Sequence, residues 1–212
     1  MDEPSDSTSD IDERQALSPF VRMGVFVEGG LGVFGWIVGA WRGIDWAALL
    51  SGSPEAVLWG VFGGLGLVGL HLVLLLPGGD RNPLYRTIYR PLVRMLRSRV
   101  QGVRTLGLVG LAVASGVGEE MLFRGWLQAE VGLVGASVLF GAAHVWGREG
   151  WPYGLYAAVM GAGLGGLLIV TGSLWAPILA HGLNNLLGFL ALRDGWFAPP
   201  EDSTNELRPP AG

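Results

Sequence analysis

Five side chains able to do acid–base chemistry interrupt otherwise apolar stretches of this sequence. They are Glu119, Glu120, His144, His181 and Asn185. Carboxylates and imidazoles transfer protons, and an amide donates a hydrogen bond to a developing negative charge. A charge at the centre of a bilayer costs about 2.5–3.5 kcal/mol on insertion scales, so polar groups in such stretches indicate a function.

Helical spacing separates the two neighbouring carboxylates. Successive helical residues point about 100° apart, so Glu119 and Glu120 cannot share a face. Glu120 stands four residues before Arg124, the favourable order for an ion pair. Glu119 is then left over, and it must be protonated, meet a cation or face water. Such a carboxylate is typical of a general base or a metal ligand.

The remaining polar residues complete a candidate site. His181 and Asn185 lie four residues apart and share a helical face. Oxygen and nitrogen ligands from Glu119, His144, His181 and Asn185 suit a divalent metal with an open water position, zinc being the first choice. The same groups also suit water activation without a metal, with Asn and His as oxyanion donors. The residues leave both chemistries open.

The composition points to a membrane protein. Half of the 212 residues are hydrophobic and only 15% are charged, and the mean hydropathy is +0.43. The absence of cysteine excludes disulfides, thiolate nucleophiles and Cys-ligated metal centres. A net charge of −4 argues against nucleic acid as a partner.

Apolar stretches of suitable length predict an all-α, polytopic transmembrane bundle of about six spanning helices. The expected spans are 20–41, 56–76, 105–128, 131–146, 153–172 and 174–192. An arginine-rich stretch around 84–100 has helical apolar spacing and predicts an interfacial amphipathic helix, kinked at Pro91; a solvated basic loop is the alternative. We expect an acidic disordered tail over 1–18, a single membrane domain over 19–193 and a flexible tail over 194–212.

The distribution of arginine predicts the orientation. Placing 77–104 in the cytoplasm puts most arginines there, so both termini should be cytoplasmic. We expect an integral, multi-pass protein of a prokaryotic cell membrane, in contact with lipid. Glu28 and His71 stand alone in their apolar stretches and are interpreted as structural residues.

The three motifs together resemble a known family. The pattern E-E-x-x-x-R, then F-x-x-x-H, then H-x-x-x-N is similar to that of the CPBP intramembrane proteases, which include CAAX prenyl endopeptidases and the bacteriocin-processing or immunity proteins also called Abi. The resemblance covers roughly 105–190, and the first hundred residues carry no matching motif. Arg124 and Phe140 belong to the pattern as supporting residues.

The resemblance implies peptide hydrolysis at the membrane. Glu119 would activate water with His144 as its partner, Glu120 would be the second acid, and His181 and Asn185 would polarise the carbonyl or join a metal site. The small size of the chain puts a prenylated substrate in doubt. The alternatives are a non-enzymatic immunity or regulatory partner protein and, third, an ion transporter. The oligomeric state is left open.

The expected boundaries contain one conflict. If both helices are straight spans, Glu119 lies about 22 Å above the cytoplasmic end of its helix, at 1.5 Å per residue. His144 would then lie near the cytoplasmic end of the next helix. The two can meet only if the first helix begins deeper, tilts, or bends near Gly116 and Gly118.

Overall fold

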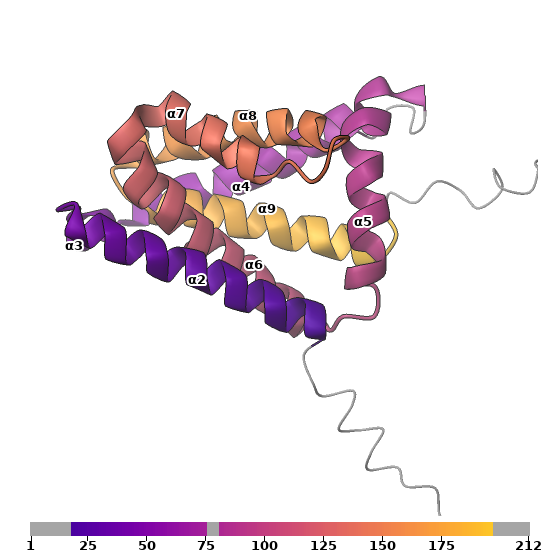
Figure 1. Cartoon of the computed structure of the whole chain (residues 1–212), viewed down its shortest axis with the longest axis horizontal. Helices are drawn as coiled ribbons and strands as arrows, with labels where there is room; N and C mark the ends of the chain where they lie inside the picture. Colours follow the sequence, from indigo (N-terminus) through magenta and orange to yellow (C-terminus); the bar gives the residue numbers. More distant parts are fainter. Residues whose placement is uncertain (1–17, 76–80, 197–212) are drawn as a thin grey trace, which may run out of the picture.

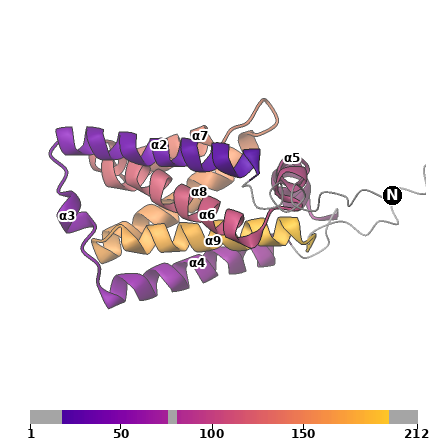
Figure 2. The same cartoon turned by 90° about the horizontal axis from the view of Figure 1, so that it is seen from below.

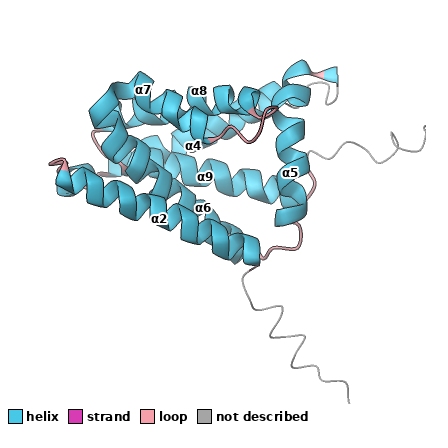
Figure 3. Ribbon diagram, in the orientation of Figure 1, coloured by secondary structure: helices cyan, strands magenta, loops and turns pink. Residues whose placement is uncertain are grey.

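The computed structural model describes residues 18–75 and 81–196, and every regular element in them is helical (Figure 3). The all-α class is therefore confirmed. The expected tails fall almost entirely outside the described residues. The elements are α2 (Pro19–Trp41), α3 (Trp46–Leu49), α4 (Pro54–Leu75), the π-helix η2 (Tyr85–Tyr89), α5 (Arg90–Val100), α6 (Thr105–Glu120), the π-helix η3 (Met121–Leu127), α7 (Gln128–Ala143), α8 (Trp151–Thr171) and α9 (Trp175–Arg193).

The long helices run roughly along one direction and form a bundle (Figures 1 and 2). α6 and α9 lie in the interior, with α2 packed on α6, α4 on α9, and α7 on α8. Large apolar side chains such as Phe26, Trp41 and Val73 point outward and are 79%, 82% and 70% exposed. An apolar exterior of this kind fits a lipid surrounding.

Five helical segments of the described chain are long and apolar enough to cross a membrane, rather than the expected six. The expected spans 105–128 and 131–146 belong to one helical segment, Thr105–Ala143, which turns back at Gly132. Gly132 has φ 73° and ψ 174°, a conformation that is essentially restricted to glycine. The arm that follows Gly132 rises only about 17 Å, which is too short to span a bilayer.

This short returning arm resolves the depth conflict. Helical rise of about 20 Å carries the chain from Glu119 to Gly132, and about 18 Å brings it back to His144. The two side chains therefore reach the same depth without a bend near Gly116 or Gly118, where α6 is regular. The expected position of His144 near the cytoplasmic end was wrong, because the arm stops halfway across the bundle.

The arginine-rich helix lies across one end of the bundle. Figures 1 and 2 show α5 roughly perpendicular to the long helices, at the end where α2 begins and α9 finishes. Its Val93 and Val100 are buried in an apolar cluster with Val21 and Leu192. The amphipathic helix is thus confirmed in place of the loop. Directly before Pro91 the helix is a π-helix, in which the Arg90 N–H bonds to the Tyr85 carbonyl five residues earlier. Pro91 itself has no N–H to donate.

Glycine permits the closest helix contacts. A Cβ at Gly118 would collide with the carbonyl oxygen of Glu28, so α2 passes directly over the glycine beside Glu119. At Gly60 and Gly64, α4 comes within van der Waals distance of the α9 backbone. These contacts are what small residues allow at helix interfaces inside membranes.

We expect Gly118→Ala to destabilise the bundle by about 1–3 kcal/mol, as overpacking usually does. The matched control is Gly110→Ala on the same helix, where an added Cβ meets nothing within 4 Å. Thermal unfolding in detergent should show a lower midpoint for Gly118→Ala alone. Equal midpoints for the two variants would contradict the close α2–α6 contact.

Candidate active site

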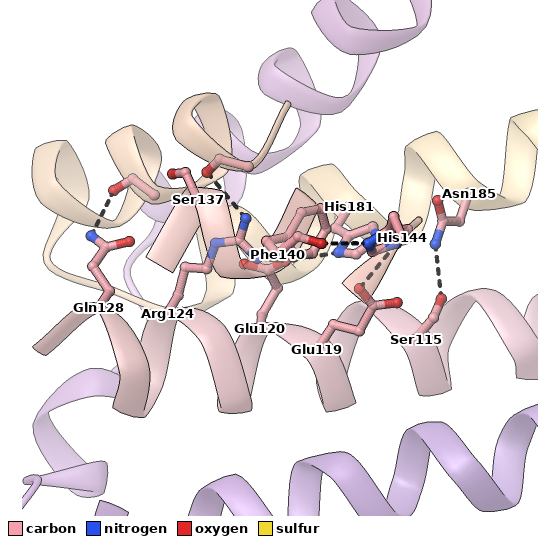
Figure 4. A network of polar contacts seen from close by, with 12 residues as sticks. Ser115, Glu119, Glu120, Arg124, Gln128, Ser137, Phe140, His144, His181 and Asn185 are labelled. Carbon is pink, nitrogen blue, oxygen red and sulfur yellow. Dashed lines mark hydrogen bonds and ion pairs between the residues drawn. The ribbon is translucent and has the colours of Figure 1, made fainter. Parts of the chain in front are cut away.

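Glu119 and His144 face each other in the middle of the bundle (Figure 4). Glu119 is near the end of α6, and His144 directly follows the last residue of α7. Glu119 Oε2 lies 3.6 Å from His144 Nε2, and these side chains are only 9% and 17% exposed. That separation is longer than a direct hydrogen bond. We call these two atoms the open pair, because neither satisfies the other and both can contact a third group.

Phe140 sets the orientation of His144. The Phe140 carbonyl lies 2.8 Å from His144 Nδ1 and accepts a hydrogen bond when that nitrogen is protonated. In neutral imidazole the proton on Nδ1 leaves Nε2 as an acceptor, and Nε2 is the atom that faces Glu119. The Phe140 ring also stacks near His144, with centroids 4.5 Å apart. Phe140 therefore supports the site through both its backbone and its ring.

Glu120 is the centre of a second, fully buried set of contacts. Its Oε1 accepts hydrogen bonds from Arg124 at 2.9 Å and from His181 Nδ1 at 2.8 Å. The pairing with Arg124 is confirmed, and the side chains of that ion pair are 1% and 0% exposed. Arg124 also donates to the Gly161 carbonyl of α8 at 3.1 Å. One carboxylate thus connects the α6–η3 segment, α9 and, through arginine, α8.

Asn185 is held by a residue that the sequence analysis missed. Its Nδ2 donates to Ser115 Oγ at 2.9 Å, and Ser115 donates to the Ala112 carbonyl at 3.2 Å. Ser115 stands four residues before Glu119, on the same face of α6. That spacing was the signal that could have identified Ser115.

Three of the five candidate polar residues line a small cavity. A space of about 60 Å³ is bordered by His144, His181 and Asn185, together with Tyr153 and Tyr156 of α8. The structure therefore brings the three motifs to one place, with Glu119 against His144 and Glu120 against His181. The sequence analysis did not identify the two tyrosines as site residues, because aromatic residues at helical spacing are typical of any apolar helix.

Glu28 and His71 do not stand alone. Glu28 approaches α6 at Gly118, and its buried Oε2 has no hydrogen-bond partner among the described residues. His71 of α4 borders the same small cavity, with its ring 5.3 Å from that of Tyr156. Their interpretation as structural residues stays a prediction, and these contacts between distant helices are invisible in the local sequence.

The fit to a metal ion is best for two side chains and open for two more. Glu119 Oε2 and His144 Nε2 lie together without a direct hydrogen bond between them. His181 Nδ1 and Asn185 Nδ2 are bonded to Glu120 and Ser115, which leaves His181 Nε2 and Asn185 Oδ1 as their possible ligand atoms. Among residues 18–75 and 81–196, no group of three or more His, Asp or Glu is placed to hold a metal. The divalent metal therefore stays a prediction, with Glu119 and His144 as its best-placed ligands.

We expect Glu120→Gln to destabilise the protein by about 3–5 kcal/mol, because it leaves the Arg124 charge buried without its counter-ion. At about 2–4 °C per kcal/mol, the melting midpoint should fall by roughly 6–20 °C. Glu119→Gln is the control, since Glu119 Oε2 has no hydrogen bond to lose. Similar midpoints for the two variants would contradict the structural role given to Glu120.

Comparison with known proteins gives a family match over the site. Residues 101–187 match the family described as type II CAAX prenyl endopeptidase Rce1-like. An uncharacterized protein of Bacillus subtilis, YpbD, is 35% identical over 74 residues, which cover 35% of this chain and 39% of that protein. The match thus spans about two fifths of the relative's length. No solved structure matches the chain significantly.

The matched range includes every residue of the three motifs. These residues are Glu119, Glu120, Arg124, Phe140, His144, His181 and Asn185. Five apolar helices accompany the match, so the protein is an integral membrane protein. Residues 101–187, which carry the three motifs, are thus similar to the type II CAAX prenyl endopeptidases.

Proposed function

We propose that this protein is an intramembrane endopeptidase that hydrolyses a peptide bond in a membrane-associated peptide or protein. The observation that carries the proposal is the open pair formed by Glu119 Oε2 and His144 Nε2, 3.6 Å apart in a buried site. Both atoms can accept a hydrogen bond from a water molecule that lies beside the pair.

The proposed reaction begins with attack by that water on the scissile carbonyl carbon. Glu119 takes a proton from the water as the new C–O bond forms, with His144 holding the water in place. Collapse of the tetrahedral intermediate breaks the C–N bond, and the proton held by Glu119 passes to the leaving nitrogen. The products are a new carboxylate and a new amine.

His181 and Asn185 are proposed to stabilise the negative oxygen of the intermediate. Both border the small cavity beside His144. In the doubly protonated form of His181, Nδ1 donates to Glu120 and Nε2 carries the hydrogen that would be offered to the oxyanion. Removing one such donor typically costs about 10²–10³ in kcat.

A zinc ion is the alternative activator of the water. Glu119 and His144 would hold it, and it would supply a water of lowered pKa and a polarised carbonyl. The substrate class is a peptide segment at or within the bilayer, with no requirement for a prenyl group. We also propose the prokaryotic cell membrane as the location. Both termini would lie in the cytoplasm, since arginines concentrate in α5 and at the ends of α2, α6 and α9 that adjoin it.

The experiment that tests the function compares protein termini in membranes of cells that carry wild type or Glu119→Gln. New C-termini should be present with wild type and absent with the variant, since loss of a general base lowers the rate by about 10²–10⁴. Glu55→Gln makes the same chemical change at an exposed position of α4 and should keep the new termini.

Identical termini in all three membranes, at equal protein levels, would contradict the protease. That result would favour the non-enzymatic partner, in which the polar cluster only holds helices together. Ion flux into liposomes that depends on Glu119, without new termini, would favour the transporter.

The metal proposal has its own test. If zinc is held by Glu119 and His144, purified wild type should contain zinc by elemental mass spectrometry, and His144→Ala should contain less. Chelation should abolish cleavage and added zinc should restore it. Cleavage that persists in chelated, zinc-free protein would contradict the zinc proposal and leave the metal-free reaction.

A further inference from the structure

A polar cluster, most of it outside the three motifs, lies between the active site and a second cavity. The second cavity has a volume of about 360 Å³ and lies between α4, α5 and α9. Five residues border both cavities: His71, Tyr153, Tyr156, Asn184 and the motif residue Asn185. A ligand in the larger cavity would therefore contact this cluster on the side of the reacting groups.

The larger cavity is lined mainly by apolar side chains. Leu72 of α4, Leu92 of α5 and Leu187 of α9 are typical of its walls. Gly188 also borders it, and a Cβ added there would meet nothing within 4 Å. The cavity is large enough for one or two bulky aliphatic or aromatic side chains.

One buried polar atom of the cluster, the Tyr156 hydroxyl, lacks a partner among the described residues. The Asn184 side chain hydrogen-bonds to His71, and its amide oxygen has lone-pair capacity for a further donor. Leaving the hydroxyl unsatisfied costs about 1–3 kcal/mol, so it requires a hydrogen-bonding ligand. The hydroxyl can donate and the amide oxygen can accept, which matches the C=O and N–H of a peptide backbone.

His71 completes the cluster from α4. Its ring lies 5.3 Å from that of Tyr156, and its side chain interacts with Asn184. His71 therefore limits the positions that Tyr156 and Asn184 can take. His71 lies outside the matched range 101–187, so the family match assigns it no part in the site.

A peptide that is to be cut inside the bundle must leave its helical conformation near the scissile bond. Its freed N–H and C=O groups then need partners, because the hydrocarbon core supplies none. We propose that Tyr156 and Asn184, positioned by His71, bind the backbone of an extended substrate segment beside Glu119 and His144, while an adjacent apolar side chain of the substrate fills the 360 Å³ cavity. This inference rests on the proposed function, because it assigns the substrate-binding part of the same site.

The test measures peptide binding in the full chain carrying Glu119→Gln, so that hydrolysis plays no part. The probe is a blocked peptide, acetyl-Ala-Leu-photoleucine-Leu-Ala-amide, irradiated with the protein in lipid nanodiscs. Mass spectrometry should place its cross-links on the walls of the 360 Å³ cavity. Tyr156→Phe and Asn184→Leu should each reduce this labelling about three- to tenfold, as expected for one lost hydrogen bond.

A matched glycine pair tests the cavity itself. Gly188→Leu should nearly abolish the labelling, because the leucine side chain would occupy the 360 Å³ cavity. A Cβ at this position meets nothing within 4 Å, so the α9 backbone can stay in place. Gly163→Leu makes the same change on the exposed side of α8, where an added Cβ also meets nothing, and should leave labelling unchanged. His71→Leu should weaken labelling, and His71→Gln should restore part of it.

A photoreactive fatty acid without a peptide group separates a peptide subsite from a lipid pocket. Its labelling should be insensitive to Tyr156→Phe and Asn184→Leu. The inference is overturned if the peptide does not label the cavity, or if its labelling is as insensitive as that of the fatty acid. Peptide labelling could respond as expected while the protein termini in cells are the same with wild type and Glu119→Gln. That combination would support the subsite and contradict the proposed function.

Discussion

The buried charge of Glu120 is the constraint on which the arrangement of this protein depends. A carboxylate with no exposed surface is tolerable only if its neighbours compensate its charge, and here Arg124 and His181 do so at 2.9 and 2.8 Å. Arg124 extends the connection to α8 through the Gly161 carbonyl. Because Glu120 belongs to α6, His181 to α9 and the Gly161 carbonyl to α8, these contacts fix how the three helices meet. The neighbouring Glu119 then faces His144 inside the bundle, with its side chain only 9% exposed.

The second requirement is that Glu119 and His144 arrive at one depth. The chain reverses at Gly132, which has a positive φ. The helical rise from Glu119 to Gly132 is about equal to the rise from Gly132 back to His144. At the far end of the bundle, Arg42 holds Glu130 at 2.7 Å and so ties the end of α2 to the segment just before this turn. The short arm therefore ends inside the bundle, where the Phe140 carbonyl orients the imidazole toward the carboxylate.

Local patterns in the sequence predict much of this arrangement. The features that they miss depend on contacts between helices that are distant in the sequence. Helical spacing alone predicted the ion pair of Glu120 with Arg124 and predicted that Glu119 is not part of it. Both predictions depend only on residues within one helical turn. The amphipathic α5 was predicted on the same ground. Hydropathy could not reveal that the stretch after Gly132 is a half-length arm, since its composition equals that of a full span. The role of His71 depends on helices that meet only in the folded bundle, so no local pattern identified it. For Ser115 the four-residue spacing to Glu119 was available, but its bond to Asn185 of α9 was not.

The central claim is that Glu119 and His144 face each other within the membrane domain, and one cross-linking measurement tests it most directly. The chain contains no cysteine, so Glu119→Cys with His144→Cys provides a unique thiol pair. A short bifunctional methanethiosulfonate, applied in native membranes, should join this pair and should not join Glu119→Cys with Asp45→Cys at the far end of the bundle. Failure to join positions 119 and 144, when each thiol alone is labelled, would contradict the account.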